Sequence, residues 1–257
     1  MKKKLYPLLA VVLSAVGFGL QYLAQMNPLA VQMDTDTAAM IAVKCFFVAV
    51  PVIALLCSLP LRGTDEQIDA SGRLYENLNF AARFCGVLAG MIFCGGALLR
   101  LVTGAKSGVG IATLAVDVLL LAAGVSMVWQ IVSPGPSRSL FALLPGFAAA
   151  FWLVIYYHTQ SKDPIVERYG ALLLCLMAMA LACYHQAGYS FGRANPVRAM
   201  TFSLIGGIYA FTALPTAQDE ADALLMTAIG VWMVLHTALL PAAPVLSARH
   251  LAAETAE

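Results

Sequence analysis

The chain has 257 residues, of which 61 % are apolar and only 11 % are charged, and its formal net charge is +1. Soluble domains contain about 45–50 % apolar and about 25 % charged residues, and a soluble fold of this size could not bury so much apolar surface. The near-neutral charge, without a basic stripe that alternates with aromatic residues, argues against a nucleic-acid-binding protein. We therefore expect the lipid bilayer to surround this chain.

Eight long apolar stretches define the predicted secondary structure. A membrane-spanning helix needs about 20 apolar residues to cross about 30 Å of hydrocarbon. Only helices and closed barrels satisfy all backbone polar groups in lipid, and these runs lack the alternation of barrel strands. We predict an all-α integral membrane protein, a polytopic bundle of about eight transmembrane helices in a single transmembrane domain, residues 1–257. The predicted spans are 5–24, 38–60, 80–102, 110–132, 139–158, 166–190, 198–215 and 221–242.

The first span follows three lysines and resembles a secretory signal peptide in its positive start and apolar run. The apolar run is too long for a signal peptide, however, and no A-x-A cleavage site follows it. We interpret residues 5–24 as a retained first transmembrane helix.

Charged residues in the second to fourth spans are the main candidates for a functional site, because a charge within a span costs about 2.5–3.5 kcal/mol and needs a partner or water. At 1.5 Å per residue, Lys44 and Asp117 lie about 9 and 12 Å from the same predicted end of the bundle. We predict a buried Lys44–Asp117 pair, joined by Arg100, that binds a small polar or ionic solute. The structural alternatives are a plain ion pair and a snorkelling Lys44. Asp222, at the edge of its span, is interpreted as a helix N-terminal charge.

Two histidines in the sixth and eighth spans form a second, weaker candidate site. His185 and His236 lie at similar depth from the ends of their spans, as the axial ligands of a haem require. Two neutral imidazoles could also bind a metal or carry protons. The alternative is that each imidazole makes a hydrogen bond to a neighbouring helix. We expect no cofactor, with haem b as the alternative.

The distribution of cations predicts the orientation, because Lys and Arg prefer cytoplasmic loops. With the N-terminus inside, ten cations fall on the inner side and four on the outer side. The inner residues are Lys2, Lys3, Lys4, Arg62, Arg73, Arg83, Arg138, Arg193, Arg198 and Arg249, and the outer residues are Arg100, Lys106, Lys162 and Arg168. We predict a multi-pass protein of the plasma (cytoplasmic) membrane with both termini in the cytoplasm. A seven-span alternative, with 101–132 divided differently, would place the C-terminus outside.

Similar stretches in the two halves of the chain suggest an internal duplication. The fourth span reads "DVLLLAAGVSMVW" from Asp117, and the eighth reads "DALLMTAIGVWMV" from Asp222. A repeat of four plus four helices, with halves 1–133 and 139–245 and a short tail 246–257, would place a site between the halves. Chance similarity between apolar sequences is the alternative.

No motif identifies a reaction. The sequence has no P-loop, Rossmann glycine fingerprint, G-x-S-x-G or HExxH, so we do not expect an enzyme, although the sequence leaves this open. The six cysteines lie in apolar stretches and are interpreted as core residues. We expect a small-solute permease; the alternatives are a non-catalytic scaffold or subunit with a membrane partner or as a homo-oligomer, and a haem- or metal-binding membrane protein.

Overall fold

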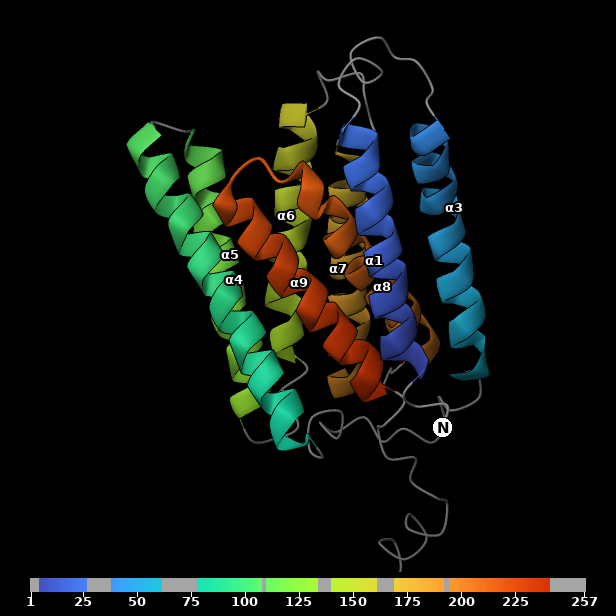
Figure 1. Ribbon diagram of the computed structural model, residues 1–257. Helices are drawn as coiled ribbons and strands as arrows, with labels where there is room; N and C mark the ends of the chain where they lie inside the picture. Colours follow the sequence, from blue (N-terminus) through green and yellow to red (C-terminus); the bar gives the residue numbers. More distant parts are fainter. Residues whose placement is uncertain are drawn as a thin grey trace, which may run out of the picture.

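The computed structural model of the protein describes residues 5–26, 38–61, 78–107, 110–133, 140–160, 169–191 and 195–240 (Figure 1). Within these ranges the chain forms eight α-helices and no strand. The helices are α1 (Leu5–Gln25), α3 (Ala38–Ser58), α4 (Phe80–Ser107), α5 (Ile111–Val132), α6 (Leu143–Gln160), α7 (Gly170–Ala187), α8 (Pro196–Ala213) and α9 (Glu220–Leu239). Short 3₁₀ turns, η2 (Leu59–Leu61), η5 (Gly188–Phe191) and η6 (Leu214–Thr216), extend α3, α7 and α8.

All eight helices are long and apolar enough to cross a membrane, so the prediction of an all-α polytopic bundle is confirmed. Successive helices run in opposite directions, and α1 begins at the same end of the bundle at which α9 ends (Figure 1). The seven-span alternative therefore does not fit the described helices. The fourth predicted span agrees with α5, whereas α4 continues to Ser107, five residues past its expected end at 102. Residues 166–168 of the sixth predicted span lie outside the described residues.

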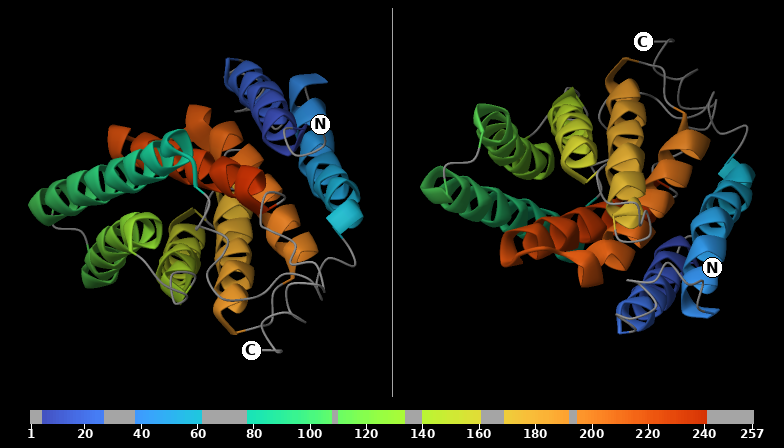
Figure 2. Two further views of the ribbon diagram at one scale, coloured as in Figure 1. Left: turned by 90° about the horizontal axis from the view of Figure 1, so that it is seen from below. Right: turned by 90° about the horizontal axis from the view of Figure 1, so that it is seen from above.

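Six of the helices form a closed ring. In order around the ring, α4 packs against α5, α5 against α6, α6 against α7, α7 against α8, α8 against α9, and α9 returns to α4 (Figure 2). The hairpin of α1 and α3 lies outside this ring, mainly against α8. The core of the ring is filled by large side chains, among which Trp152 and Trp232 are both 0 % exposed.

Helix α8 is the central element, because it contacts α7 and α9 within the ring and α1 and α3 outside it. Of its spanning part, 72 % is buried inside the protein, against 28 % for α1 and α3. Small residues permit this close packing. At Gly17 of α1 an added Cβ would meet the side chain of Thr212 on α8 and would lie 2.7 Å from Phe46 Cε1 on α3.

A proline in α3 is compensated by a hydroxyl group from α8. Pro51 has no N–H, so the carbonyl of Phe47, four residues earlier, lacks its helical donor. The hydroxyl of Tyr209 donates to that carbonyl at 2.6 Å, and the two rings of Phe47 and Tyr209 pack edge to face. In lipid, where water cannot replace the missing donor, this bond both satisfies the α3 backbone and fixes α3 on α8.

The same arrangement occurs at the beginning of α6. Pro145 withdraws the helical donor from the carbonyl of Phe141. The hydroxyl of Ser126 on α5 donates to this carbonyl at 2.6 Å. Pro51 of α3 and Pro145 of α6 are therefore each matched by a hydroxyl from a neighbouring helix.

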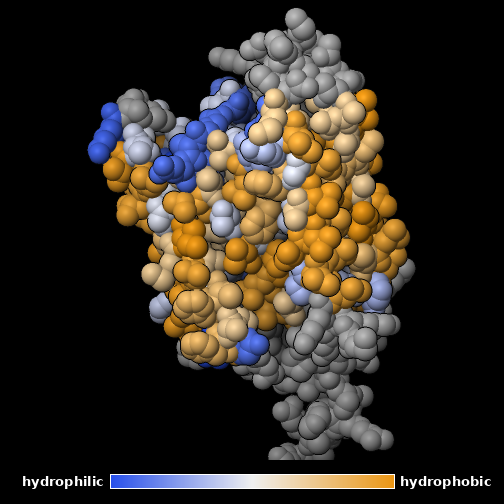
Figure 3. All heavy atoms as spheres, viewed as in Figure 1, coloured by the Kyte–Doolittle hydropathy of each residue, from blue (hydrophilic) through white to orange (hydrophobic). Residues whose placement is uncertain are grey.

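The outer surface of the bundle is apolar, as lipid contact requires. Large apolar side chains point outward around the circumference; Val48 on α3 is 71 % exposed and Phe151 on α6 is 56 % exposed. Figure 3 shows hydrophobic residues over the middle of the visible face and hydrophilic residues at its upper end, over the end of α4 and the start of α9. That upper end also holds the charged cluster described below.

The two halves of the chain do not pack alike. The hairpins α4–α5 and α8–α9 both form close antiparallel pairs. In the second half α7 packs extensively on α8, whereas in the first half α3 packs mainly on α8 and α1, away from α4. Figure 2 shows α3 and α4 on different sides of the molecule. The internal duplication between halves 1–133 and 139–245 therefore stays a prediction, without a matching arrangement of four helices to support it.

Candidate functional site

The guanidinium of Arg100 on α4 connects two aspartates from two other helices. Its Nε lies 2.7 Å from Asp117 Oδ1 on α5, and its Nη1 lies 2.8 Å from Asp222 Oδ1 on α9. We call Arg100, Asp117 and Asp222 the charged cluster. It joins three neighbouring members of the ring, α5, α4 and α9, at one end of the bundle (Figure 1).

Helix geometry explains why Arg100 and Asp117 lie at the same level. Helices α4 and α5 form an antiparallel hairpin around Gly110. Arg100 precedes the end of α4 by seven residues, and Asp117 follows the first residue of α5 by six, so each lies about 10 Å along its helix. Since charged groups at that depth need partners, the hairpin brings each residue the opposite charge.

The beginning of α9 supplies the third member of the cluster. Asp219 caps this helix, because its side chain accepts a hydrogen bond from the backbone N–H of Asp222 at 2.7 Å. Asp222 therefore lies in the first helical turn, where the positive end of the helix dipole stabilises a carboxylate. The interpretation of Asp222 as a helix N-terminal charge is confirmed, but sequence reasoning missed its ion pair with Arg100.

Helix α6 closes the cluster on its remaining side. The Arg100 guanidinium lies over the indole of Trp152, 5.1 Å from the ring centroid, in a cation–π arrangement. Tyr156, one turn further along α6, is buried and lies within electrostatic range of Asp222 and Arg100. Four helices of the ring thus contribute side chains to one site.

Asp117 is the most deeply buried member of the cluster and is not fully satisfied. Its side chain is 1 % exposed. The approach of Arg100 Nε to Oδ1 is an ion-pair contact without the alignment of a hydrogen bond, and Oδ2 has no hydrogen-bond donor among the described residues. Buried carboxylate oxygens in folded proteins normally have such donors. The cluster also contains two carboxylates for one guanidinium, so its formal charge is negative.

Lys44 is not part of this cluster, so the prediction of a Lys44–Asp117 pair is wrong. The carboxylate of Asp117 faces Arg100. Lys44 lies on the exposed face of α3, in a shallow apolar groove that Val48 and Val52 also line. Figure 2 shows α3 and α5 on opposite flanks of the bundle. Similar depth was a correct observation, but depth alone does not determine which helices are neighbours.

The two histidines have different surroundings. His236 is 0 % exposed, and its Nδ1 lies 2.8 Å from the carbonyl of Trp232. His185 is partly exposed and stacks in parallel on the ring of Phe202, with centroids 5.7 Å apart. Among the described residues, no group of three or more His, Cys, Asp or Glu side chains could hold a metal ion. Haem binding by His185 and His236 stays a prediction.

Buried polar side chains near the other end of the ring were missed by sequence reasoning. Gln186 on α7 and Ser203 on α8 are both 0 % exposed. Neither the amide of Gln186 nor the hydroxyl of Ser203 has a hydrogen-bond partner among the described residues. Single Gln and Ser residues in apolar sequence carry little signal, so only the burial in the structure identifies them.

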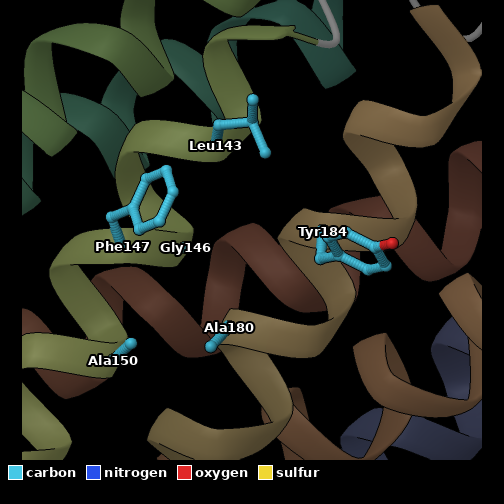
Figure 4. Close-up of a pocket in the computed structure, with 6 residues that line it drawn as sticks. All are labelled: Leu143, Gly146, Phe147, Ala150, Ala180 and Tyr184. Carbon is cyan, nitrogen blue, oxygen red and sulfur yellow. The ribbon is translucent and has the colours of Figure 1, made fainter. Parts of the chain in front are cut away.

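A groove between α6 and α7 offers no comparable chemistry. It has a volume of about 170 Å³ and opens on the flank of the bundle. Figure 4 shows Leu143 and Phe147 of α6 on one side and Ala180 and Tyr184 of α7 on the other. The phenol of Tyr184 is the one polar side-chain group among the lining residues, so the groove suits an acyl chain better than an ionic solute.

Comparison with known proteins gives no match: no family model fits the chain, and no curated protein or solved structure is significantly similar to it. What the fold defines is a class, the polytopic helical membrane proteins. Within this class, the charged cluster is the feature of the chain that bears on a particular activity.

Proposed function

We propose that this chain is a small-solute permease of the cytoplasmic membrane, and that the charged cluster binds the polar or ionic solute. The observation that carries the proposal is the unsatisfied Oδ2 of Asp117, a buried carboxylate oxygen in a ring of helices. In a network with a purely structural role, a buried carboxylate oxygen normally has a hydrogen-bond donor. A binding site keeps one bonding position for a ligand.

The location of the cluster supports this proposal. Ionisable side chains inside membrane proteins usually face the bundle interior and mark substrate or ion pathways. Arg100 receives contacts from α5, α6 and α9, so the cluster faces the inside of the ring and not the lipid. The cation distribution in the sequence assigns this end of the bundle to the outer side of the membrane. The solute would therefore enter the site from outside.

The proposal is tested with purified protein in liposomes. The vesicles are loaded with a defined mixture of isotope-labelled amino acids, carboxylic acids and nucleosides, and the release of each compound is measured by mass spectrometry against protein-free vesicles. We expect at least one compound to leave faster with the wild type and at the protein-free rate with Asp117→Asn. Glu220→Gln, an exposed change at the start of the same helix as Asp222, is the matched control and keeps the wild-type rate.

The proposal is wrong if the wild-type protein is inserted, and helical by circular dichroism, but releases no compound faster than protein-free vesicles. In that case the structural-subunit alternative becomes the better description. If the wild type and Asp117→Asn release a compound equally fast, and both faster than protein-free vesicles, the protein is a permease but the charged cluster is not its binding site.

A further inference from the structure

We propose that the charged cluster holds one proton, and that this proton resides on Oδ2 of Asp117. The inference deepens the proposed function, because a proton bound in the solute site is a coupling ion for a permease. The proton itself can be detected without any transport, so the two proposals can fail separately.

The charges of the described side chains in the cluster do not balance. Arg100 provides one positive charge, and Asp117 and Asp222 provide two negative charges when both are ionised. Asp219 adds a further carboxylate within electrostatic range of both aspartates. Among the described residues, the other ionisable side chain within electrostatic range of Arg100 and Asp222 on the packed helices is the phenol of Tyr156, which supplies no positive charge. An unbalanced negative charge in a low-dielectric interior is unfavourable, and such a group is normally neutralised by a proton.

The two aspartates of the cluster differ in how well their ionised forms are stabilised. Asp222 receives an aligned hydrogen bond from Arg100 Nη1 and lies in the first turn of α9, and both features favour its ionised form. Asp117 lies inside α5, away from either helix end, and is 1 % exposed, and its Oδ2 has no hydrogen-bond donor among the described residues. The ionised form is therefore less stabilised at Asp117, so the proton binds there.

The described side chains of the cluster suit a proton better than a metal cation. An alkali or alkaline-earth ion needs several oxygen ligands arranged around it. The described residues contain no group of three or more acidic, His or Cys side chains that could hold a metal ion. A proton needs only one oxygen, and Asp117 Oδ2 is available. Protonation takes one H⁺ from the medium and converts the carboxylate to a neutral carboxylic acid whose O–H can then donate to a solute.

The experiment is infrared spectroscopy of the purified protein in lipid, which detects the C=O stretch of a protonated carboxyl group and its shift in D₂O. We expect the wild type to show this band at neutral pH. Asp117→Asn should lose it. Asp222→Asn should lose it as well, because Arg100 then balances Asp117 alone and Asp117 ionises. Glu220→Gln should keep it.

The result for Asp222→Asn separates this proposal from a simple buried acid, which would stay protonated in that variant. A wild type without a protonated carboxyl band at neutral pH overturns the proposal, and this measurement does not depend on whether any variant folds. A band that disappears when sodium replaces choline at constant pH also overturns it, since a metal ion would then supply the charge. If the wild type shows the band but transports no compound, the proposed proton site is kept and the proposed permease function is rejected.

Discussion

Arg100 and Asp222 are 122 positions apart in the sequence, yet their side chains meet at 2.8 Å. This contact links the first half of the chain to its last helix. Together with the Arg100–Asp117 contact, it makes a single guanidinium the common partner of α5 and α9. The two aspartates are also those that begin the similar stretches from 117 and 222, so the sequence similarity coincides with a shared partner.

Replacement of Arg100 should strongly destabilise the protein. Arg100→Met removes the positive charge that faces Asp117 and Asp222, and loss of one partner from a buried ion pair costs about 3–5 kcal/mol. We expect a lower thermal midpoint in detergent, measured by the helical circular-dichroism signal. The triple variant Arg100→Met with Asp117→Asn and Asp222→Asn should recover part of this loss. A triple variant less stable than Arg100→Met would show that the carboxylates do not depend on Arg100.

The proline compensation in α3 predicts a non-additive pair of substitutions. Tyr209→Phe leaves the Phe47 carbonyl without a donor, which costs about 1–3 kcal/mol. In a Pro51→Ala background residue 51 gains an N–H that can donate to the same carbonyl. The cost of Tyr209→Phe should therefore be clearly smaller in that background. An equal cost in both backgrounds, measured by chemical unfolding in bicelles, would mean that Tyr209 acts only through ring packing.

Gly17 and Gly19 lie two residues apart on α1, which is about half a helical turn. They provide a matched test of how α1 docks on its neighbours. Gly17→Ala places a Cβ against Thr212 and Phe46 and should destabilise the protein by about 1–3 kcal/mol. At Gly19 an added Cβ has no atom within 4 Å among the described residues, so Gly19→Ala should be neutral or stabilise α1 by about 0.5–1 kcal/mol. The difference in thermal midpoint between the two variants measures the close approach of α1 to α8. Equal midpoints would contradict it.

A double-mutant cycle checks the corrected position of Lys44. Because Lys44 and Asp117 lie on helices at opposite flanks of the bundle, the effects of Lys44→Met and Asp117→Leu on the free energy of unfolding should add within about 0.3–0.5 kcal/mol. The buried pair expected from the sequence requires instead that Asp117→Leu reduces the effect of Lys44→Met. The same cycle with Arg100→Met in place of Lys44→Met should show strong coupling.

The number and type of the helices could be predicted because both depend on local composition. Eight apolar runs of about 20 residues can hardly be anything but helices in lipid, and most of their ends lie within a few residues of the prediction. The longer α4 is an instructive exception. Its last turns, "VTGAKS", are too polar to be counted as part of a span, but a helix continues freely past the hydrocarbon into the interface.

The neighbours of each helix could not be predicted, because they depend on packing between segments that are distant in sequence. The choice of Asp117 and Arg100 as candidate site residues follows from the rule that charges within spans are functional or paired. The choice between Lys44 and Arg100 as the main partner required the ring order, which no single residue encodes. The ion pair of Asp222 with Arg100 was not predicted, because its place in a first helical turn already explained its charge. The buried Gln186 and Ser203 had no local signal at all.

The attachment of α1 and α3 has a consequence for biosynthesis. These helices leave the ribosome before the six helices of the ring, and their docking partner α8 is synthesised only after α4 to α7. Until α8 is synthesised, the hairpin of α1 and α3 therefore lies in the bilayer without its final contacts. The carbonyl of Phe47 has no hydrogen bond from Tyr209 during that time. The remaining six helices are contiguous in the sequence and can close on one another as soon as α9 is released from the translocon. Assembly thus ends, rather than begins, with the segments that were inserted first.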